Sequence, residues 1–184
     1  TMTRPFRFGL QAYSSSTPSD WRELAKKTED LGFSSFHLAD HYVGEGPALE
    51  AANHPLQNLA ALPAMTVAAE ATESIRIGCR VLCCDYHEPV VLAKEVATID
   101  WFSAGRLELG LGAGWIQSEY EAMGIPMMSP GKRIDKMVET LDLIRQHYSG
   151  EQIHLDGEYI KVSGFSGAPI LSLIHISEPT RLSL

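Results

Sequence analysis

Residues 103–115 read SAGRLELGLGAGW, and this stretch decides how the surrounding chain folds. Residues 106–111 are predicted to form a strand, which ends in the small residues Gly112, Ala113 and Gly114. The segment before it favours a helix that begins at Pro89, where the missing backbone N–H of proline costs little. A helix followed by a strand is the repeating unit of a parallel α/β sheet.

Strand and helix signals alternate along the rest of the chain. We predict strands over residues 6–11, 35–39, 75–82 and 106–111. Helices are expected from Asp20, where Glu23 completes a capping-box-like start, to Gly32, and then over Pro63–Ala71, from Pro89, and through Ile134–Ile144. This α/β pattern implies a parallel sheet with right-handed crossovers. Either an open doubly wound sheet or half of a (β/α)8 barrel fits, since a complete barrel needs roughly 250 residues.

Two connecting segments interrupt the alternation. The loop over residues 40–58 is long enough to be functional or mobile. Residues 153–162 predict a small hairpin that turns at Asp156-Gly157.

Composition limits the classes of partner and site. A net charge of −8 over 184 residues argues against nucleic acid and anionic membranes as partners. No apolar run approaches the roughly 20 residues of a membrane span, and residues 1–5 lack the apolar core that is typical of a secretion signal. Cys79, Cys83 and Cys84 lack the spacing of a disulfide framework or a metal site. We therefore expect a cytoplasmic protein without a bound metal.

Ligands of parallel α/β folds bind at the carboxyl ends of the strands. That rule selects Gln11, the pair Asp40-His41, residues 83–87 and residues 112–115. A histidine such as His41 can relay a proton to a reacting ring, but on the dipeptide alone a loop histidine that caps or solvates the barrel mouth is the favoured interpretation. Small residues such as Gly112 and Gly114 let a flat ring approach the backbone, but a tight strand exit would also need them.

The chain resembles the luciferase-like monooxygenase superfamily, and within it the coenzyme F420-dependent oxidoreductases. The resemblance covers residues 4–169 and is carried by residues 4–9, 38–41, 87–95 and 103–115, followed by Glu119-Tyr120 and Gly124. It implies that residues 1–169 are the N-terminal half of a luciferase-like (β/α)8 TIM barrel, with strands one to four and the small hairpin. The phosphate-binding residues would then lie in the other half.

The resemblance also assigns roles to residues of the site. His41 would lie beside a flavin or deazaflavin ring and take part in catalysis, and a cis peptide bond between Arg80 and Val81 would support the ring. The cofactor-binding residues it implies are Gln11, Asp40, Arg80, Val81, Gly112, Ala113 and Gly114. Trp115 stands where sugar-phosphate dehydrogenases of the superfamily carry a catalytic glutamate, which argues against the same substrate chemistry.

We therefore expect the full-length protein to be an oxidoreductase that transfers a hydride between coenzyme F420 and a small organic substrate. An FMN-dependent monooxygenase using O2 is the alternative. A non-catalytic flavin-binding protein and a non-functional truncated fragment belong to other classes. A homodimer of the full-length protein stays open.

The end of the chain breaks the pattern. Residues 171–181 match, residue for residue, one translated frame of an adapter used in transposase-based sequencing libraries. We expect residues 170–184 to be a non-native tail, and the gene to continue beyond it. A natural fifth strand over residues 170–176 is the other interpretation.

Overall fold

The computed structural model describes residues 6–170, so the adapter-like stretch at 171–181 lies outside the described residues. Its centre is a parallel four-stranded sheet in the order β1 (Gly9–Gln11), β2 (Ser35–Leu38), β3 (Arg76–Cys79) and β5 (Leu107–Glu108). Each strand therefore pairs with its neighbour in the sequence, as the half-barrel interpretation predicted.

The third and fourth predicted strands are each divided in two. The chain leaves the β3 ladder at a cis Arg80–Val81 bond and resumes as β4 (Leu82–Cys83), which pairs in parallel with β6 (Leu111–Gly112). The first strand is shorter than predicted and begins at Gly9. The divided strands bring both chain segments to the same end of the sheet.

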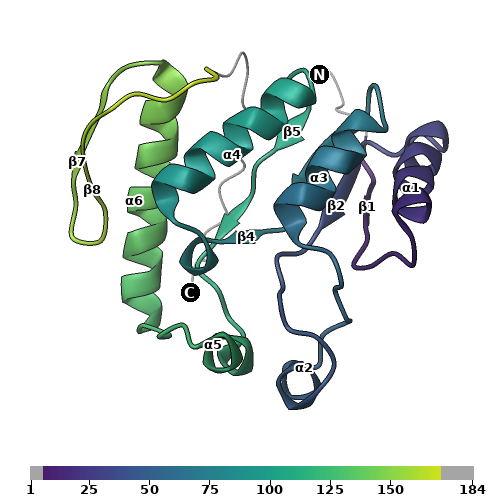
Figure 1. Ribbon diagram of the computed structural model, residues 1–184, viewed down its shortest axis with the longest axis horizontal. Helices are drawn as coiled ribbons and strands as arrows, with labels where there is room; N and C mark the ends of the chain where they lie inside the picture. The colour runs from purple at the N-terminus through teal and green to yellow at the C-terminus, as the bar shows by residue number, and fades with distance from the viewer. Residues whose placement is uncertain (1–5, 171–184) are drawn as a thin grey trace.

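Four helices cover one face of the sheet: α1 (Pro18–Asp30), α3 (Ala61–Glu70), α4 (Pro89–Phe102) and α6 (Pro130–Ser149) (Figure 1). An open doubly wound sheet would place helices on both faces. Helices on one face and a sequential strand order are the arrangement of a (β/α)8 barrel wall. In the described residues, no helix is long and apolar enough to cross a membrane.

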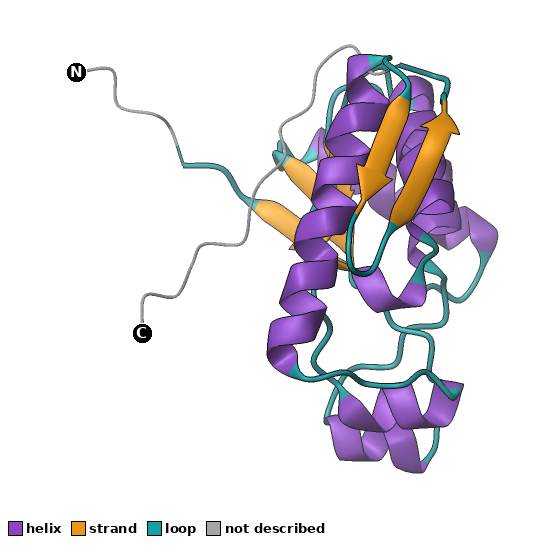
Figure 2. Cartoon of the chain, turned by 90° about the vertical axis from the view of Figure 1, so that its left-hand side faces the viewer, coloured by secondary structure: helices purple, strands orange, loops and turns teal. Residues whose placement is uncertain are grey.

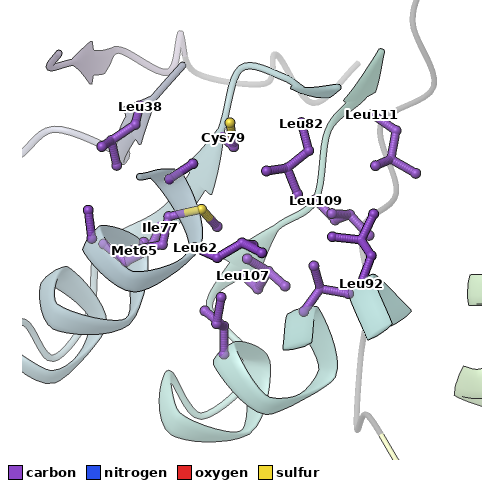
Figure 3. Close-up of a cluster of buried hydrophobic side chains, with 14 of the residues drawn as sticks. Leu38, Leu62, Met65, Ile77, Cys79, Leu82, Leu92, Leu107, Leu109 and Leu111 are labelled. Carbon is purple, nitrogen blue, oxygen red and sulfur yellow. The ribbon is translucent and has the colours of Figure 1, made fainter. Parts of the chain in front are cut away.

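The core lies between this helical layer and the strands (Figure 3). Leucine side chains alternate along the 107–111 segment, and Leu107, Leu109 and Leu111 are all buried. They meet apolar side chains of α3 and α4, among them Met65 and Leu92. At about 25 cal/mol per Å² of apolar area, this burial is the main force that holds the helices to the sheet.

Helix α1 begins earlier than the sequence predicted. Thr17 is the N-cap, because its hydroxyl accepts a hydrogen bond from the Asp20 N–H at 3.1 Å, and Pro18 occupies the first turn. The predicted start at Asp20 was therefore wrong. The Thr17 hydroxyl accepts one of the free N–H groups of the first turn, and Pro18 needs no acceptor, so the helix begins three residues before the capping-box pattern indicated. The helix ends before Gly32, as predicted, with Gly32 at a φ of +80°.

Two short helices were not predicted. The 40–58 loop contains α2 (Pro47–Ala52), and α5 (Gln117–Met123) follows β6. They lie side by side beyond the carboxyl ends of the strands (Figure 2), where the Ser118 hydroxyl donates to the Ala48 carbonyl at 2.8 Å. A single 3-10 turn, η1 (Cys84–Tyr86), leads from β4 into α4.

The hairpin forms as β7 (Ile153–Asp156) and β8 (Lys161–Phe165), packed on α6. Its turn spans residues 157–160 rather than Asp156-Gly157. The Glu139 carboxylate of α6 accepts the backbone N–H groups of residues 158, 159 and 160, at 2.8 to 2.9 Å. These hydrogen bonds from α6 stabilise the longer turn. They could not be predicted from the Asp156-Gly157 pair alone.

Candidate functional site

A small cavity of about 110 Å³ opens at the carboxyl ends of β2, β4 and β6. Its lining contains Asp40, His41, Arg80, Val81, Cys83, Tyr86, Gly112, Gly114 and Trp115. Six of the eight predicted site residues are therefore neighbours in space. Gln11 lies at the end of β1, in register with His37, and is not part of this lining. Ala113 also lies outside the lining, although its two neighbours belong to it.

The cis bond between Arg80 and Val81, which the resemblance implied, is confirmed. It places Val81 against the neighbouring strand, where two glycines make room for the side chain. A Cβ atom added to Gly112 would lie 2.5 Å from Val81 Cγ2, and one added to Gly110 would lie 2.9 Å from Val81 Cγ1. Packing of Val81 therefore explains Gly112 without any ligand.

Gly114 is also explained by the protein itself. Its φ is +75°, a conformation that favours glycine. A side chain there would collide with the Tyr120 ring and with Cys83 Sγ. The interpretation that Gly112 and Gly114 open the backbone to a ligand is thus not needed to account for either residue, although both line the cavity.

His41 is paired with a buried carboxylate that comes 78 residues later in the chain. The His41 Nδ1 atom lies 2.7 Å from Glu119 Oε2 in the first turn of α5. The Tyr86 hydroxyl donates to the same oxygen at 3.0 Å, and the Tyr42 N–H donates to Glu119 Oε1 at 2.7 Å. Glu119 is fully buried.

These contacts keep Glu119 ionised. Burial alone would raise the pKa of its carboxyl, but the hydrogen bonds from His41, Tyr42 and Tyr86 outweigh burial and hold the pKa below its ordinary value. A buried carboxylate that accepts several hydrogen bonds is a fixed negative charge beside the imidazole. Histidine next to such a charge is suited to proton transfer.

Aromatic rings enclose His41 on its other sides. The His54 ring, from the end of the 40–58 loop, lies 4.0 Å from the His41 ring between centroids, and Trp115 meets both rings edge-on. His54 Nδ1 lies 2.8 Å from the Pro55 carbonyl and therefore carries a proton. Burial, followed by the neighbouring His41, lowers the pKa of His54. The sequence had given no sign of this cluster.

Asp40 ties two strand ends together. Its Oδ2 atom accepts the Cys83 N–H at 2.8 Å and lies 2.8 Å from His87 Nε2. Its Oδ1 atom is buried and, among the described residues, accepts no hydrogen bond. One oxygen of this carboxylate therefore supports the fold, and Asp40 is also part of the cavity lining. His87, the last residue of the 83–87 range selected from the sequence, is therefore a hydrogen-bond partner of Asp40.

The loop after β6 is held from α6. Arg133 donates to the carbonyls of Met128 and Ala113 at 3.0 Å, and also to the carbonyl of Gly114. Tyr120 reinforces the same region, because its hydroxyl donates to Asp85 Oδ2 at 2.9 Å. These contacts fix the position of Trp115, whose side chain remains 64 % exposed beside the cavity.

The cysteines do not provide a nucleophile. Cys79, Cys83 and Cys84 are free and buried, and burial raises the pKa of Cys84 to about 12. A thiol with a raised pKa is unreactive near neutral pH. Within residues 6–170, no group of three or more His, Cys, Asp or Glu side chains is placed to hold a metal ion.

Sequence reasoning selected His41, together with the 83–87 and 112–115 ranges that contain Tyr86 and Trp115. It missed Glu119, His54 and Arg133, which reach the site from segments far apart in the chain and whose local spacing does not indicate it. The one available signal was the Glu119-Tyr120 pair, which is part of the resemblance described above.

Comparison with known proteins agrees with this arrangement. The model of the luciferase-like monooxygenase family matches residues 2–174. An F420-dependent glucose-6-phosphate dehydrogenase of Amycolatopsis mediterranei is 30% identical over 146 residues, which is 79% of this chain and 42% of that protein. The chain spans about half the length of the curated relatives it matches.

Two solved structures share the fold. An F420-dependent secondary alcohol dehydrogenase in complex with an F420-acetone adduct superposes with a TM-score of 0.77 at 23% identity, over 94% of this chain and 51% of that one. The oxygenating constituent of 3,6-diketocamphane monooxygenase from Pseudomonas putida, in complex with FMN, gives a TM-score of 0.69 at 19% identity, over 85% of this chain and 43% of that one. The half-barrel prediction is confirmed. Because the family model spans nearly the whole sequence, this chain belongs to the luciferase-like monooxygenase family.

Proposed function

We propose that the full-length protein is an oxidoreductase that uses coenzyme F420 to transfer a hydride to or from a small organic substrate. The observation that carries the proposal is the His41–Glu119 pair, at 2.7 Å, on the lining of a cavity at the carboxyl ends of the strands. An imidazole held by a buried carboxylate is the arrangement of a residue that gives or takes a proton.

The residues around the cavity fit a flat heterocyclic ring. Val81 and Trp115 leave 45% and 64% of their surfaces exposed there, although both are apolar. A ring lying across the cavity mouth would cover that surface. The buried Asp40 Oδ1 would accept a hydrogen bond from a ligand N–H or O–H group, since it receives none from residues 6–170. A buried acceptor without a partner is otherwise costly.

These contacts indicate a separate chemical role for the cofactor and for each residue around it. A bound deazaflavin supplies a ring that accepts or delivers a hydride. His41 holds or releases a proton at Nε2, the nitrogen left free by Glu119. Val81 and Trp115 would cover part of a bound ring and exclude water there, which would strengthen the electrostatic interactions within the site.

Trp115 also bears on the substrate. An exposed indole at this position favours a small substrate with an apolar part, and gives no charge or hydrogen-bond acceptor for a phosphorylated sugar.

An FMN-dependent monooxygenase remains the second candidate, favoured by the fold shared with the FMN complex of the diketocamphane enzyme. Assembly of the full-length protein into a homodimer stays a prediction.

Cofactor titration of the full-length protein separates the two candidates. Purified protein is titrated with F420 and, in a parallel series, with FMN, and binding is followed by the fluorescence of each cofactor. Tight stoichiometric binding of F420, with FMN at least about tenfold weaker, is expected. Preference for FMN, together with substrate-dependent O2 consumption, would replace the first candidate by the second. Binding of neither would contradict both.

A further inference from the structure

We propose that Glu119 is the positioning residue of His41: it fixes the Nδ1–H tautomer, so that Nε2 is the nitrogen that exchanges a proton at the site. This inference rests on the proposed function for its catalytic meaning. The tautomer itself is a property of this chain and can be measured without turnover.

The tautomer follows from counting donors around Glu119. The Tyr42 N–H and the Tyr86 hydroxyl both donate to the carboxylate, at 2.7 and 3.0 Å. The hydrogen bonds from Tyr42 and Tyr86 favour the charged form of Glu119, and its pKa lies below the ordinary value despite burial. An ionised carboxylate only accepts hydrogen bonds. His41 Nδ1, 2.7 Å from Oε2, must therefore be the donor in that contact.

A lone pair on Nδ1 would be repelled at this distance. With the proton on Nε2 instead, the Nδ1 lone pair would face the Glu119 oxygen at 2.7 Å without a hydrogen between them. The buried carboxylate would lose a charge-assisted hydrogen bond, and no water reaches it because Glu119 has no exposed surface. The Nδ1–H form is thus the stable neutral tautomer.

The ring has little freedom to escape this contact. His54 packs against it at 4.0 Å between centroids, and Trp115 meets it edge-on at 6.3 Å. His54 cannot act as a competing acceptor through Nδ1, because that atom already faces the Pro55 carbonyl. The His41 ring is therefore held at Nδ1 and against one face. Among residues 6–170 its Nε2 atom has no hydrogen-bond partner, and His41 lines the cavity.

Glu119 acts through His41 and not as a general base itself. Both its oxygens are engaged by His41, Tyr42 and Tyr86, and Glu119 is absent from the cavity lining. Its role resembles that of the carboxylate which orients a catalytic histidine in other enzymes, where the wrong tautomer costs several orders of magnitude in turnover.

The test measures the tautomer directly in the full-length protein. Histidine is labelled with 15N, and two-dimensional long-range 1H–15N spectra report which ring nitrogen carries the proton. The His41 signals are assigned by their loss in His41→Gln. We expect the Nδ1–H form in the wild type and a mixture containing Nε2–H in Glu119→Gln, whose amide can either accept or donate. Glu119→Leu, which can do neither, should move the population further toward Nε2–H.

Glu29→Gln is the matched control. Glu29, in the last turn of α1, is another carboxylate that accepts several backbone N–H groups. Its replacement therefore tests the general effect of removing such a carboxylate. The His41 tautomer should be unchanged in this variant. A wild-type spectrum with mainly Nε2–H, or one that stays the same in both Glu119 variants, would overturn the positioning role.

Turnover gives the second readout. Glu119→Gln should lower kcat by about 10²-fold or more while F420 affinity changes by less than about threefold, because Glu119 is buried and does not line the cavity. Glu119→Asp should recover part of the loss if its shorter side chain still reaches Nδ1. A shifted tautomer with unchanged kcat would leave the positioning intact and instead contradict the proposed role of His41.

Discussion

His41 and His54 lie with their ring centroids 4.0 Å apart and their planes at 50°. His41 follows β2, and His54 lies near the end of the 40–58 loop. The contact therefore joins the two ends of this loop at the site. Two imidazoles at this distance cannot both carry a positive charge at low cost. The packing of this loop is therefore linked to pH.

Acidification should loosen the 40–58 loop. Burial and His41 lower the pKa of His54 below its ordinary value of 6.5. The opened loop thus binds a proton more readily than the closed one, and stability present above about pH 6.5 is lost as the pH falls further. Amide hydrogen exchange of residues 40–58, corrected for intrinsic rates, should be faster at about pH 5 than at about pH 7.5.

His54→Phe is the control for that experiment, since phenylalanine keeps the ring and cannot titrate. The pH dependence of exchange in the loop should then be largely lost. If the variant shows the same acid-induced loosening as the wild type, another group is responsible and the His41–His54 contact does not sense pH.

Replacing His41 by alanine should remove proton transfer and leave the fold intact. Loss of a general acid or base typically lowers the rate by about 10²–10⁴-fold. The measurement is kcat of the full-length protein at saturating cofactor. Circular dichroism and cofactor titration establish that the variant is folded and loaded. Unchanged turnover would reduce His41 to a structural residue of the loop.

Glu29 should be a major local contributor to stability. Burial opposes its ionisation, yet hydrogen bonds from the backbone and side chain of Ser74 and the N–H groups of Ile75 and Glu73 lower its pKa from 4.5 to about 2. Its carboxylate holds the turn that leads into β3. Glu29→Gln should lower the free energy of unfolding by about 1.5–3 kcal/mol near neutral pH, the usual range for hydrogen bonds to a charged group.

The sign of the pH dependence follows from the same pKa. Since the folded value lies below the unfolded one, the contribution is present above about pH 4.5 and is lost as the pH falls toward 2. Denaturant unfolding at a series of pH values should show the wild type and Glu29→Gln converging in this range. Curves that stay parallel down to about pH 2 would contradict the role of Glu29.

The sequence predicted those features that depend on neighbouring residues. Alternating leucines in 107–111 and the small residues after them located a strand and its end, and Pro89 located a helix start. Thr17 shows the limit of such patterns, because Asp20 with Glu23 looked like the better helix start. The choice was decided by a single side-chain hydrogen bond that the composition of the first turn does not reveal.

The candidate site was predictable only in part for a related reason. His41 and Asp40 could be selected because strand ends meet at one edge of a parallel sheet. Glu119 follows His41 by 78 residues and lies on a helix of seven residues that was not predicted. Its pairing depends on how α5 packs against the 40–58 loop, which is a tertiary contact without a local signature.

The last prediction concerns Val81, which is wedged between two glycines. A Cβ atom on Gly110 would lie 2.9 Å from Val81 Cγ1, and a Cβ atom on Gly112 would lie 2.5 Å from Val81 Cγ2. Gly112→Ala should therefore lower the free energy of unfolding by about 1–3 kcal/mol through overpacking.

Val81→Ala removes both methyl groups, so the double variant Gly112→Ala/Val81→Ala should be less destabilised than the sum of the single variants, with a coupling of about 0.5–3 kcal/mol. Unfolding in urea for all four proteins of the cycle provides the numbers. Strict additivity would contradict the coupling between Gly112 and Val81. A Gly112→Ala protein that is as stable as the wild type but binds cofactor poorly would show that the glycine is kept for a ligand and not for Val81.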